Sequence, residues 1–242
     1  MFNAWGIGQR DLNNGVLLLV APKDQALVAL RPESGEALWW LRPRFPARQS
    51  LSQYSMANLN RAPLVGWEKS LLFLSLRGIL SQLDAEGKVL AQLRVPRGDD
   101  FWARPVVCGD SFFAATRRGE LLEIHLGDWK LLSFENFSPS HGNFPGGAEV
   151  LADLCSFGNR VLVATVDGTL YCRSSQGSTP QVCWSRPLGT GLETLNAQAL
   201  PVFQPVCDEQ GRVFVAYGRT LVCLNSEKGD EQWRYQSSAA FS

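Results

Sequence analysis

The sequence shows no excess of charge of either sign. Its 23 lysines and arginines balance 23 aspartates and glutamates, so the formal net charge is zero over 242 residues. A protein that binds the phosphate backbone of nucleic acid normally carries a clear basic excess, because neutralising phosphates supplies much of the affinity. We therefore expect no nucleic acid partner.

Long apolar segments are also missing. The longest apolar run near the amino terminus, Val16–Ala21, is far shorter than the roughly 20 residues of a membrane-spanning helix. The first residues, Met1–Gly6, have neither the basic segment nor the apolar segment of a secretory signal. We expect a cytoplasmic protein that does not insert into a membrane, or a periplasmic one if the sequence begins after a signal.

Short apolar runs, in contrast, are abundant. Hydrophobic residues make up 45% of the chain and charged residues 19%, as in a soluble globular protein. A five-residue apolar run recurs with start-to-start spacings of 55, 41, 49 and 52 residues. Each run is bounded by turn residues, which is typical of buried strands. The runs are 16–20, 71–75, 112–116, 161–165 and 213–217.

A tight turn and a second strand follow each run. The clearest turn is Asp167-Gly168, since Asp-Gly favours a hairpin turn whose central residues have positive φ. Two residues after the turn glycine, or its equivalent, every copy has a leucine. This column predicts one buried site used five times, formed by Leu27, Leu80, Leu121, Leu170 and Leu221.

A further turn leads to another strand that carries a large residue. Glycine marks this turn in four copies, and tryptophan follows it in three. The other two copies have Ala91 and Leu131 in the corresponding place. Because an indole combines a large apolar surface with one hydrogen-bond donor, the column predicts a structural role. The tryptophans are Trp39, Trp184 and Trp233.

A short strand precedes each run and often opens with proline, which is tolerated at the first residue of a strand. Each copy therefore predicts four short antiparallel strands. Such units, repeated every 41 to 55 residues, form the blades of a β-propeller, which bury their faces by stacking. The sequence predicts one all-β domain over residues 1–242, with blades roughly at 1–45, 60–96, 102–135, 148–187 and 200–237.

Two segments, Ala26–Trp39 and Thr220–Trp233, resemble the PQQ-type (quinoprotein-like) β-propeller repeat. In each, a strand that contains the column leucine is followed by a glycine turn and a tryptophan. The resemblance covers nearly the whole chain, although the third copy fits poorly. The family includes the outer-membrane assembly lipoprotein and quinoprotein dehydrogenases. The resemblance implies about five four-stranded blades, with the tryptophan docking blade against blade.

The resemblance leaves the closure of the ring open. The family usually closes with six to eight blades, so five copies form either a five-bladed ring or an arc that another chain completes. Catalytic relatives carry vicinal cysteines and a calcium site of acidic and amide side chains. This sequence has no Cys-Cys pair and no acidic cluster with calcium-loop spacing. We expect no bound PQQ and no other cofactor.

The metal-ligating residue types are few and follow the repeat. The cysteines form no Cys-x-x-Cys pair, so reduced thiols are expected. Their recurrence at the end of the first strand and in the second hairpin strand is typical of small buried residues. His125 falls at a strand end and His141 in a loop. We predict no metal site and no catalytic thiol among Cys108, Cys155, Cys172, Cys183, Cys207 and Cys223.

Candidate partner contacts lie in irregular segments, because binding residues concentrate on loops held by rigid scaffolds. Segment 42–56 combines positive charge with aromatic residues, and segment 137–147 is rich in proline, glycine and phenylalanine. Arginine and aromatic residues are enriched at interface hot spots, although ordinary inter-blade connections are the alternative. With two tryptophans in connections, the predicted contacts are Arg42, Arg44, Phe45, Arg48, Trp67, Trp102, Phe137 and Phe144.

No residues in the pattern combine a base, a nucleophile and an orienting group, so we expect no catalytic residues and no enzyme. The carboxylates near hairpin turns are expected to be solvated, namely Asp24, Glu120, Glu123 and Asp167. The leading hypothesis is a non-catalytic scaffold for protein–protein interaction in a larger complex. The alternatives are a small-ligand sensor or enzyme that uses the axial pocket, and an outer-membrane assembly-type propeller without its signal.

Overall fold

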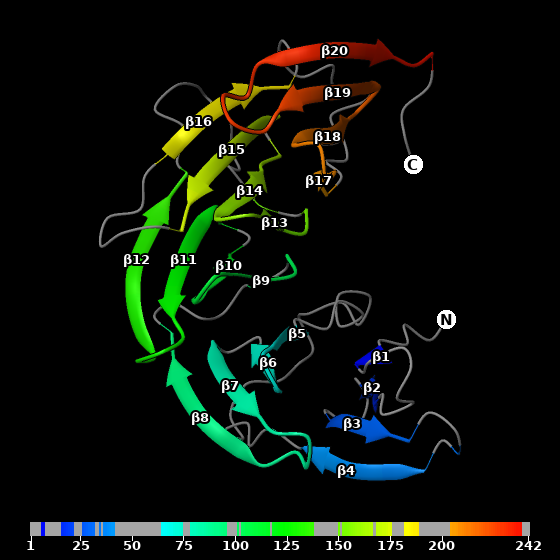
Figure 1. The fold of residues 1–242 in the computed structure, drawn as a ribbon, viewed down its shortest axis with the longest axis vertical. Helices are drawn as coiled ribbons and strands as arrows, with labels where there is room; N and C mark the ends of the chain where they lie inside the picture. The colour runs from blue at the N-terminus through cyan, green and yellow to red at the C-terminus, as the bar shows by residue number, and fades with distance from the viewer. Residues whose placement is uncertain are drawn as a thin grey trace. The chain divides into compact units, whose positions relative to one another are not determined.

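The structure is a computed structural model. It describes residues 6–7, 16–21, 26–31, 34, 36–41, 64–74, 78–95, 101, 103–116, 118–137, 150, 152–166, 168–175, 182–188 and 204–238. The described regular structure consists of five antiparallel sheets of four strands each, and within each sheet neighbouring strands follow one another in the chain (Figure 1). The predicted all-β fold with four-stranded blades is confirmed. No helix among these residues is long and apolar enough to cross a membrane.

The first of two compact units, Met1–Arg94, holds blades 1 and 2. Its small core joins Ala29 of blade 1 to Leu71 and Leu83 of blade 2. Blade 1 contains β1 (Gly6–Ile7), β2 (Val16–Ala21), β3 (Ala26–Leu30) and β4 (Ala37–Leu41), and blade 2 contains β5 (Leu64–Trp67), β6 (Ser70–Leu74), β7 (Ile79–Leu83) and β8 (Val89–Arg94).

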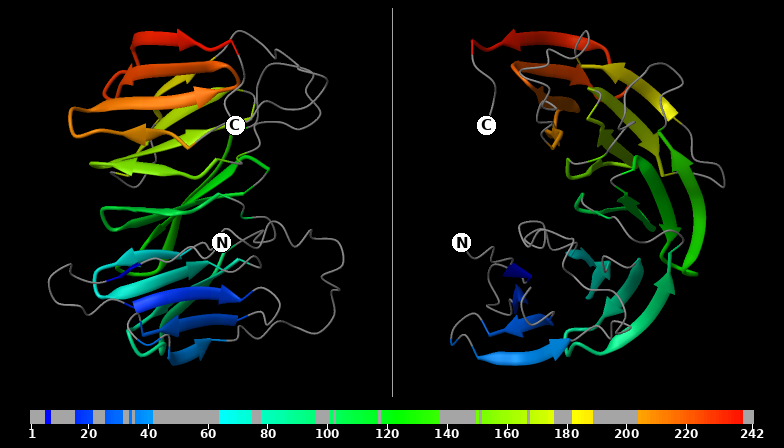
Figure 2. Two further views of the ribbon diagram at one scale, coloured as in Figure 1. Left: turned by 90° about the vertical axis from the view of Figure 1, so that its right-hand side faces the viewer. Right: turned by 180° about the vertical axis from the view of Figure 1, so that it is seen from behind.

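The second unit, Val95–Ser242, holds blades 3, 4 and 5, whose sheets are stacked on one another (Figure 2). Blade 3 contains β9 (Val106–Cys108), β10 (Ser111–Ala115), β11 (Glu120–His125) and β12 (Lys130–Asn136). Blade 4 contains β13 (Cys155–Phe157), β14 (Arg160–Ala164), β15 (Thr169–Ser174) and β16 (Val182–Pro187). Blade 5 contains β17 (Val206–Cys207), β18 (Arg212–Tyr217), β19 (Thr220–Asn225) and β20 (Glu231–Gln236).

The burial of the second strand differs between blades. In blade 4, β14 is buried on both faces after its first residue, because blade 4 packs against a sheet on each side. In blade 5, burial along β18 alternates strictly, and Val213, Val215 and Tyr217 point toward blade 4. A strand alternates in this way when only one face of its sheet is covered. Within the second unit, one face of blade 5 is therefore open.

A β-bulge recurs between the third and fourth strands of every blade. Such a bulge re-aims the neighbouring side chain, and the three column tryptophans each pair with the residue just before it. Ala91 holds this place in blade 2 and Ser133 in blade 3. The sequence assignment of Leu131 was wrong, because counting from a turn of different length placed it on the other side of the bulge, opposite Ile124.

Candidate protein interface

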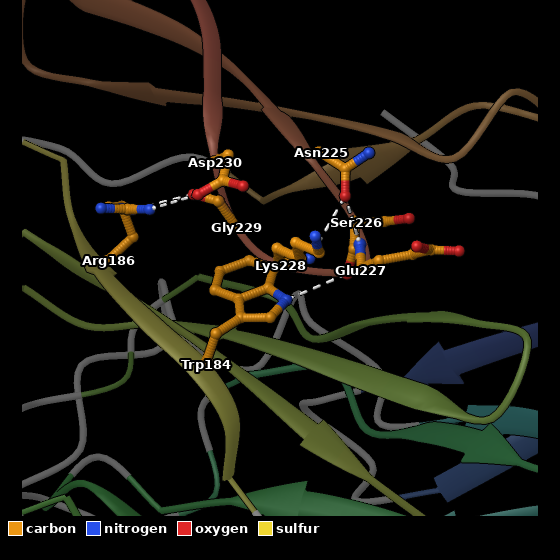
Figure 3. Close-up of polar contacts among 8 residues, drawn as sticks. All are labelled: Trp184, Arg186, Asn225, Ser226, Glu227, Lys228, Gly229 and Asp230. Atoms are coloured by element: carbon orange, nitrogen blue, oxygen red, sulfur yellow. Dashed lines mark hydrogen bonds and ion pairs between the residues drawn. The ribbon is translucent and has the colours of Figure 1, made fainter.

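A tryptophan docks one blade on the next in both units. Trp184 of blade 4 is 8% exposed, and its Nε1–H donates to the carbonyl oxygen of Ser226 in blade 5 at 2.9 Å (Figure 3). In the first unit, Trp39 of blade 1 donates in the same way to the carbonyl oxygen of Ala85 in blade 2, at 2.8 Å. The ring therefore supplies apolar contact while its one polar group finds an acceptor.

The indole rests against a glycine of the receiving turn. Gly229 faces Trp184 and Gly87 faces Trp39, and both glycines have left-handed φ values, 71° and 79°. A Cβ on Gly229 would lie 2.6 Å from the Trp184 ring, and one on Gly87 would lie 2.4 Å from the Trp39 ring. Glycine is required here because any other residue would strain the backbone and collide with the indole.

A side-chain cap fixes the shape of the receiving turn. Asn225 Oδ1 accepts the backbone N–H groups of Glu227 and Lys228, at 2.9 and 3.2 Å. In blade 2, Asp84 Oδ1 accepts the N–H groups of Glu86 and Lys88, at 3.1 and 2.7 Å. Asn and Asp favour such turns because their short side chains reach the backbone two residues on. In both blades the residue after the cap supplies the carbonyl that the indole binds.

Polar contacts surround this dock in the second unit. Arg186 of blade 4 donates from Nε to the carbonyl oxygen of Gly229 at 2.8 Å, and its Nη2 lies 3.1 Å from Asp230 Oδ1 (Figure 3). Arg234 of blade 5 donates from Nη1 to the carbonyl oxygen of Leu188 in blade 4, at 2.8 Å. The interface between blades therefore has an apolar centre and a polar rim, as protein interfaces do.

We call the side of a blade that faces the next blade along the chain its leading face. The strand pairings show which residue of blade 5 occupies the same position as each residue on the leading face of blade 4. In blade 4 it carries Cys155, Leu162, Leu170, Cys172, Trp184 and Arg186, and in blade 5 the corresponding residues are Val206, Phe214, Leu221, Cys223, Trp233 and Tyr235.

The two leading faces differ in exposure. In blade 4, Leu162 and Leu170 are fully buried by blade 5. In blade 5, Trp233 is 42% exposed, Tyr235 57% and Val206 58%. Leu221 is half-buried, whereas the column leucines Leu80, Leu121 and Leu170 are buried. The side chain of Leu27 lies outside the described residues. The leading face of blade 5 is thus more exposed than that of blade 4, although its Cys223 is buried.

Aromatic contacts constrain the side chains on the exposed face of blade 5. The rings of Phe214 and Trp233 lie with their centroids 6.0 Å apart. The Arg212 guanidinium carbon lies 5.5 Å from the centroid of the Phe214 ring, and Arg212 is paired with Asp208 at 2.6 Å. The backbone N–H of Arg212, followed by its guanidinium, holds the pKa of the Asp208 carboxyl below its usual range. The face is therefore aromatic and preorganised.

Two cysteines meet between blades 4 and 5. The Sγ atoms of Cys155 and Cys207 lie 3.9 Å apart. The hydrogen bond between the two thiols lowers the pKa of Cys155 and raises the pKa of Cys207. The sequence predicts that Cys108, Cys155 and Cys207 each end the first strand of their copies, but Cys155 begins its strand, and the registers put the three at different positions. Because Cys155 and Cys207 are offset by one residue, they lie on facing sides of adjacent blades.

Two carboxylates predicted to be solvated are buried instead. Glu120 and Glu123 lie in β11 of blade 3, which is covered on both faces. Glu123 accepts a hydrogen bond from Ser111 at 2.8 Å, and Glu120 accepts one from Thr116 at 3.2 Å. The proximity to a turn was misleading because β11 is buried along nearly its whole length. Asp24 and Asp167 lie outside the described residues.

His125 is half-buried and lies 2.8 Å from Asp128, and His141 lies outside the described residues. In the part of the chain that the structure describes, no three His, Cys, Asp or Glu side chains are grouped as metal ligands would be.

Of the predicted partner contacts, Trp67 and Phe137 lie among the described residues. Phe137 is described but buried, with its ring centroid 4.6 Å from that of Tyr171 in blade 4, so it is a core residue in this structure. Trp67 is half-buried at the end of β5. The remaining predicted contacts lie outside the described residues, namely Arg42, Arg44, Phe45, Arg48, Trp102 and Phe144. The sequence analysis missed the leading face of blade 5.

Four-stranded antiparallel blades, docked by a tryptophan on a turn glycine, are the repeating units of a β-propeller-type fold and resemble PQQ-type repeats. Over residues 128–242 the sequence matches the family model described as outer membrane protein assembly factor BamB. The predicted family resemblance is confirmed. No curated protein sequence is similar enough to this chain to count as a relative.

Solved structures with a similar fold include BamB from Moraxella catarrhalis, at 14% identity and a TM-score of 0.63, covering 93% of this chain and 62% of that one. A computationally designed protein, Ika8, gives 12% identity and a TM-score of 0.60, covering 93% and 59%. The quinohemoprotein alcohol dehydrogenase ADHIIG from Pseudomonas putida gives 11%, 0.54, 72% and 33%. This chain therefore spans less than two thirds of each of these structures.

Proposed function

We propose that this chain is a non-catalytic PQQ-type propeller scaffold that binds a protein partner within a larger complex. The observation that carries the proposal is the leading face of blade 5, where the side chains of Trp233, Tyr235 and Val206 are exposed to solvent. Exposed tryptophan and tyrosine grouped with aliphatic residues are typical of protein interfaces, because they bury much apolar area and still offer a polar group.

Two further observations support a scaffold. Where buried carboxylates occur in blade 3, they are bound to hydroxyl groups of the same blade, as structural groups are. The matched family is described as an assembly factor, which is a role in building complexes. Fold similarity by itself does not decide function, since one similar structure is a dehydrogenase, so the exposed face is the stronger support.

The test compares the mass of the native complex with that of a surface variant. We expect the wild-type chain, purified gently from its natural host, to migrate with a partner. The double substitution Trp233→Ser with Tyr235→Ser should release the chain from that complex while leaving its β-sheet circular dichroism unchanged.

The matched control is Val182→Ser. Val182 is 50% exposed on β16 of blade 4, away from the leading face of blade 5. A double variant that stays in the complex as firmly as this control would refute the proposal.

A further inference from the structure

Two thiols face each other between blades 4 and 5, away from the exposed residues on which the proposed function rests. Cys155 begins β13 and Cys207 ends β17, and these first strands of the two blades contact each other. Their Sγ atoms lie 3.9 Å apart. Both side chains pack against the core shared by the two blades, yet both are only half-buried. A small reagent can therefore reach the pair.

The strand registers direct the two sulfur atoms toward each other. Cys155 pairs with Leu162, which lies on the leading face of blade 4. Cys207 pairs with Val213, which points from blade 5 toward blade 4. Directly paired residues of antiparallel strands lie on the same face of a sheet, so each thiol faces the other blade. A shift of either strand by one residue would turn its thiol to the opposite face.

The two thiols differ in acidity. The hydrogen bond with the Cys207 thiol, together with one from the Cys207 backbone N–H, lowers the pKa of Cys155 against the opposing effect of burial. The bond between the thiols, followed by burial, raises the pKa of Cys207. Because the thiolate is the nucleophile in cysteine chemistry, Cys155 is the side chain that attacks first, and Cys207 keeps its proton.

The thiols of the neighbouring strands lack this combination. Cys108 and Cys172 are fully buried. Burial raises the pKa of Cys108, and it raises that of Cys172 to about 12. Cys183 is exposed on β16, and the thiol that it influences is the buried Cys172 of its own blade. Among the described cysteines, Cys155 and Cys207 thus form the half-exposed pair that bridges two blades.

We propose that Cys155 and Cys207 are a redox modification site, at which a hydroperoxide oxidises the two thiols to a disulfide that fastens blade 4 to blade 5. The Cys155 thiolate attacks the O–O bond of hydrogen peroxide and becomes a sulfenic acid, and the hydroxide that leaves takes a proton to form water. The Cys207 sulfur then displaces the hydroxyl group from Cys155, and the Cys207 proton leaves with it as a second water. The thiols lose two electrons and the peroxide gains them.

The disulfide has a structural consequence. It joins residues that are 52 positions apart in the sequence, and a cross-link over a long loop stabilises a fold mainly by restricting the unfolded chain. It also fastens β17, a strand of only two residues, whose Val206 is exposed on the opposite face. This inference goes beyond the proposed function and does not depend on it.

The test treats the full chain, fully reduced and then freed of reductant, with hydrogen peroxide at neutral pH. We expect a loss of about 2 Da, the mass of two hydrogen atoms. Peptide mapping should find Cys155 joined to Cys207, and dithiothreitol should reverse the change. The Tm of the oxidised chain should rise by about 4–16 °C. Cys183→Ser, which removes an exposed thiol of blade 4, is the matched control and should behave as wild type.

Two variants separate the roles of the thiols. In Cys207→Ala the sulfenic acid has no thiol to resolve it, so dimedone should trap it at Cys155. Cys155→Ala should consume peroxide about tenfold more slowly than wild type, because the ionised nucleophile is gone. Circular dichroism should show that both variants keep their β-sheet content. Cys207→Ser and Cys155→Ser repeat the measurements with a polar side chain at each position.

Several results would overturn the inference. A disulfide that joins Cys172 to Cys183, or one chain to another, would assign the reaction to other thiols. Dimedone addition at Cys183 but not at Cys155 would do the same. Thiols that all survive peroxide would refute the site, and a bond between Cys155 and Cys207 that leaves Tm unchanged would refute the fastening of the blades.

Discussion

At the scale of single residues, the contact between the tryptophan ring and the turn glycine depends on positions where a single added Cβ atom would cause a collision. Gly229 and Gly158 both have left-handed φ values, 71° and 53°, but their surroundings differ. A Cβ on Gly229 would meet the Trp184 ring, whereas a Cβ on Gly158 would meet no atom within 4 Å. The pair therefore separates the cost of the backbone conformation from the cost of the collision.

We expect Gly229→Ala to lower the free energy of unfolding by about 2–5 kcal/mol, because about 1–2 kcal/mol of left-handed strain adds to about 1–3 kcal/mol of overpacking. Gly158→Ala should cause only the strain, about 1–2 kcal/mol. Urea denaturation of both variants measures the difference. Equal losses would mean that the indole does not rest on Gly229.

The thiol pair between blades 4 and 5 gives a second residue-scale prediction. Mild treatment with diamide should join Cys155 and Cys207 in a disulfide, with the diazene reagent accepting the two hydrogen atoms. The Sγ atoms lie 3.9 Å apart, so closing the bond needs only a small movement of the side chains. Peptide mapping should find this link in wild type and in Cys223→Ser, and not in Cys155→Ser. Its absence from wild type would contradict the observed proximity.

Alkylation should also depend on pH in a residue-specific way. The lowered pKa of Cys155 keeps its thiolate populated at lower pH than in an ordinary thiol, whereas burial raises the pKa of Cys172 to about 12. As pH falls toward neutrality, iodoacetamide should therefore label Cys155 long after labelling of Cys172 has ceased. Mass spectrometry of the peptides measures both rates, and faster labelling of Cys172 would contradict this order.

At the scale of elements, the same residue in two blades has two different roles. Trp184 in β16 is covered by blade 5 and donates a hydrogen bond to the carbonyl oxygen of Ser226. Trp233 in β20 is exposed to solvent. The local sequences around the two are alike, with a turn, a strand and a bulge. What differs is whether another sheet stands against the strand.

In the free chain, Trp184→Ser should therefore lower the free energy of unfolding by about 3–5 kcal/mol, as truncation of a buried tryptophan does. Trp233→Ser should cost less than about 1 kcal/mol, because an exposed side chain has little to lose. Thermal and urea denaturation provide the comparison. A large loss for Trp233→Ser in the free chain would mean that its own sequence already covers the ring.

At the scale of the whole molecule, the leading face of blade 5 connects stability to assembly. A partner that binds only the folded chain stabilises it by about 2.7 kcal/mol at a concentration of 100 times Kd. The amides of β18 to β20 should therefore exchange hydrogen more slowly in the native complex than in the free chain. Those of β14, which is already buried on both faces, serve as the internal control. Unchanged exchange in β20 would argue against partner binding at this face.

Much of the fold could be predicted because its signals are local. Alternating and continuous apolar runs, turn glycines and the tryptophan column each lie within about ten residues, and they indicated the four strands of each blade. The bulge was harder to place. The number of residues between the turn and the residue before the bulge varies with turn length. Counting from the turn therefore selected Leu131, whereas Ser133 occupies the position of the column tryptophan.

The candidate site was mostly not predictable from the sequence, because the exposed face lies on strands of blade 5, whereas composition favoured loops. Phe137 looked like a loop contact and is packed on Tyr171, while Trp233 looked like a structural residue and is exposed. Composition reports what a side chain can do, and burial depends on a neighbour that is distant in the sequence.

The amino-acid sequence by itself determined the repeat, the β class, and the residues that make a dock, since strand periodicity and turn chemistry act between near neighbours. Only the tertiary structure decided which tryptophans are covered by a neighbouring blade. It also decided that Cys155 faces Cys207 and that Glu120 and Glu123 are buried. These outcomes depend on which sheet lies against which face. That is a contact between blades, and the repeat presents nearly the same surface whether or not it is covered.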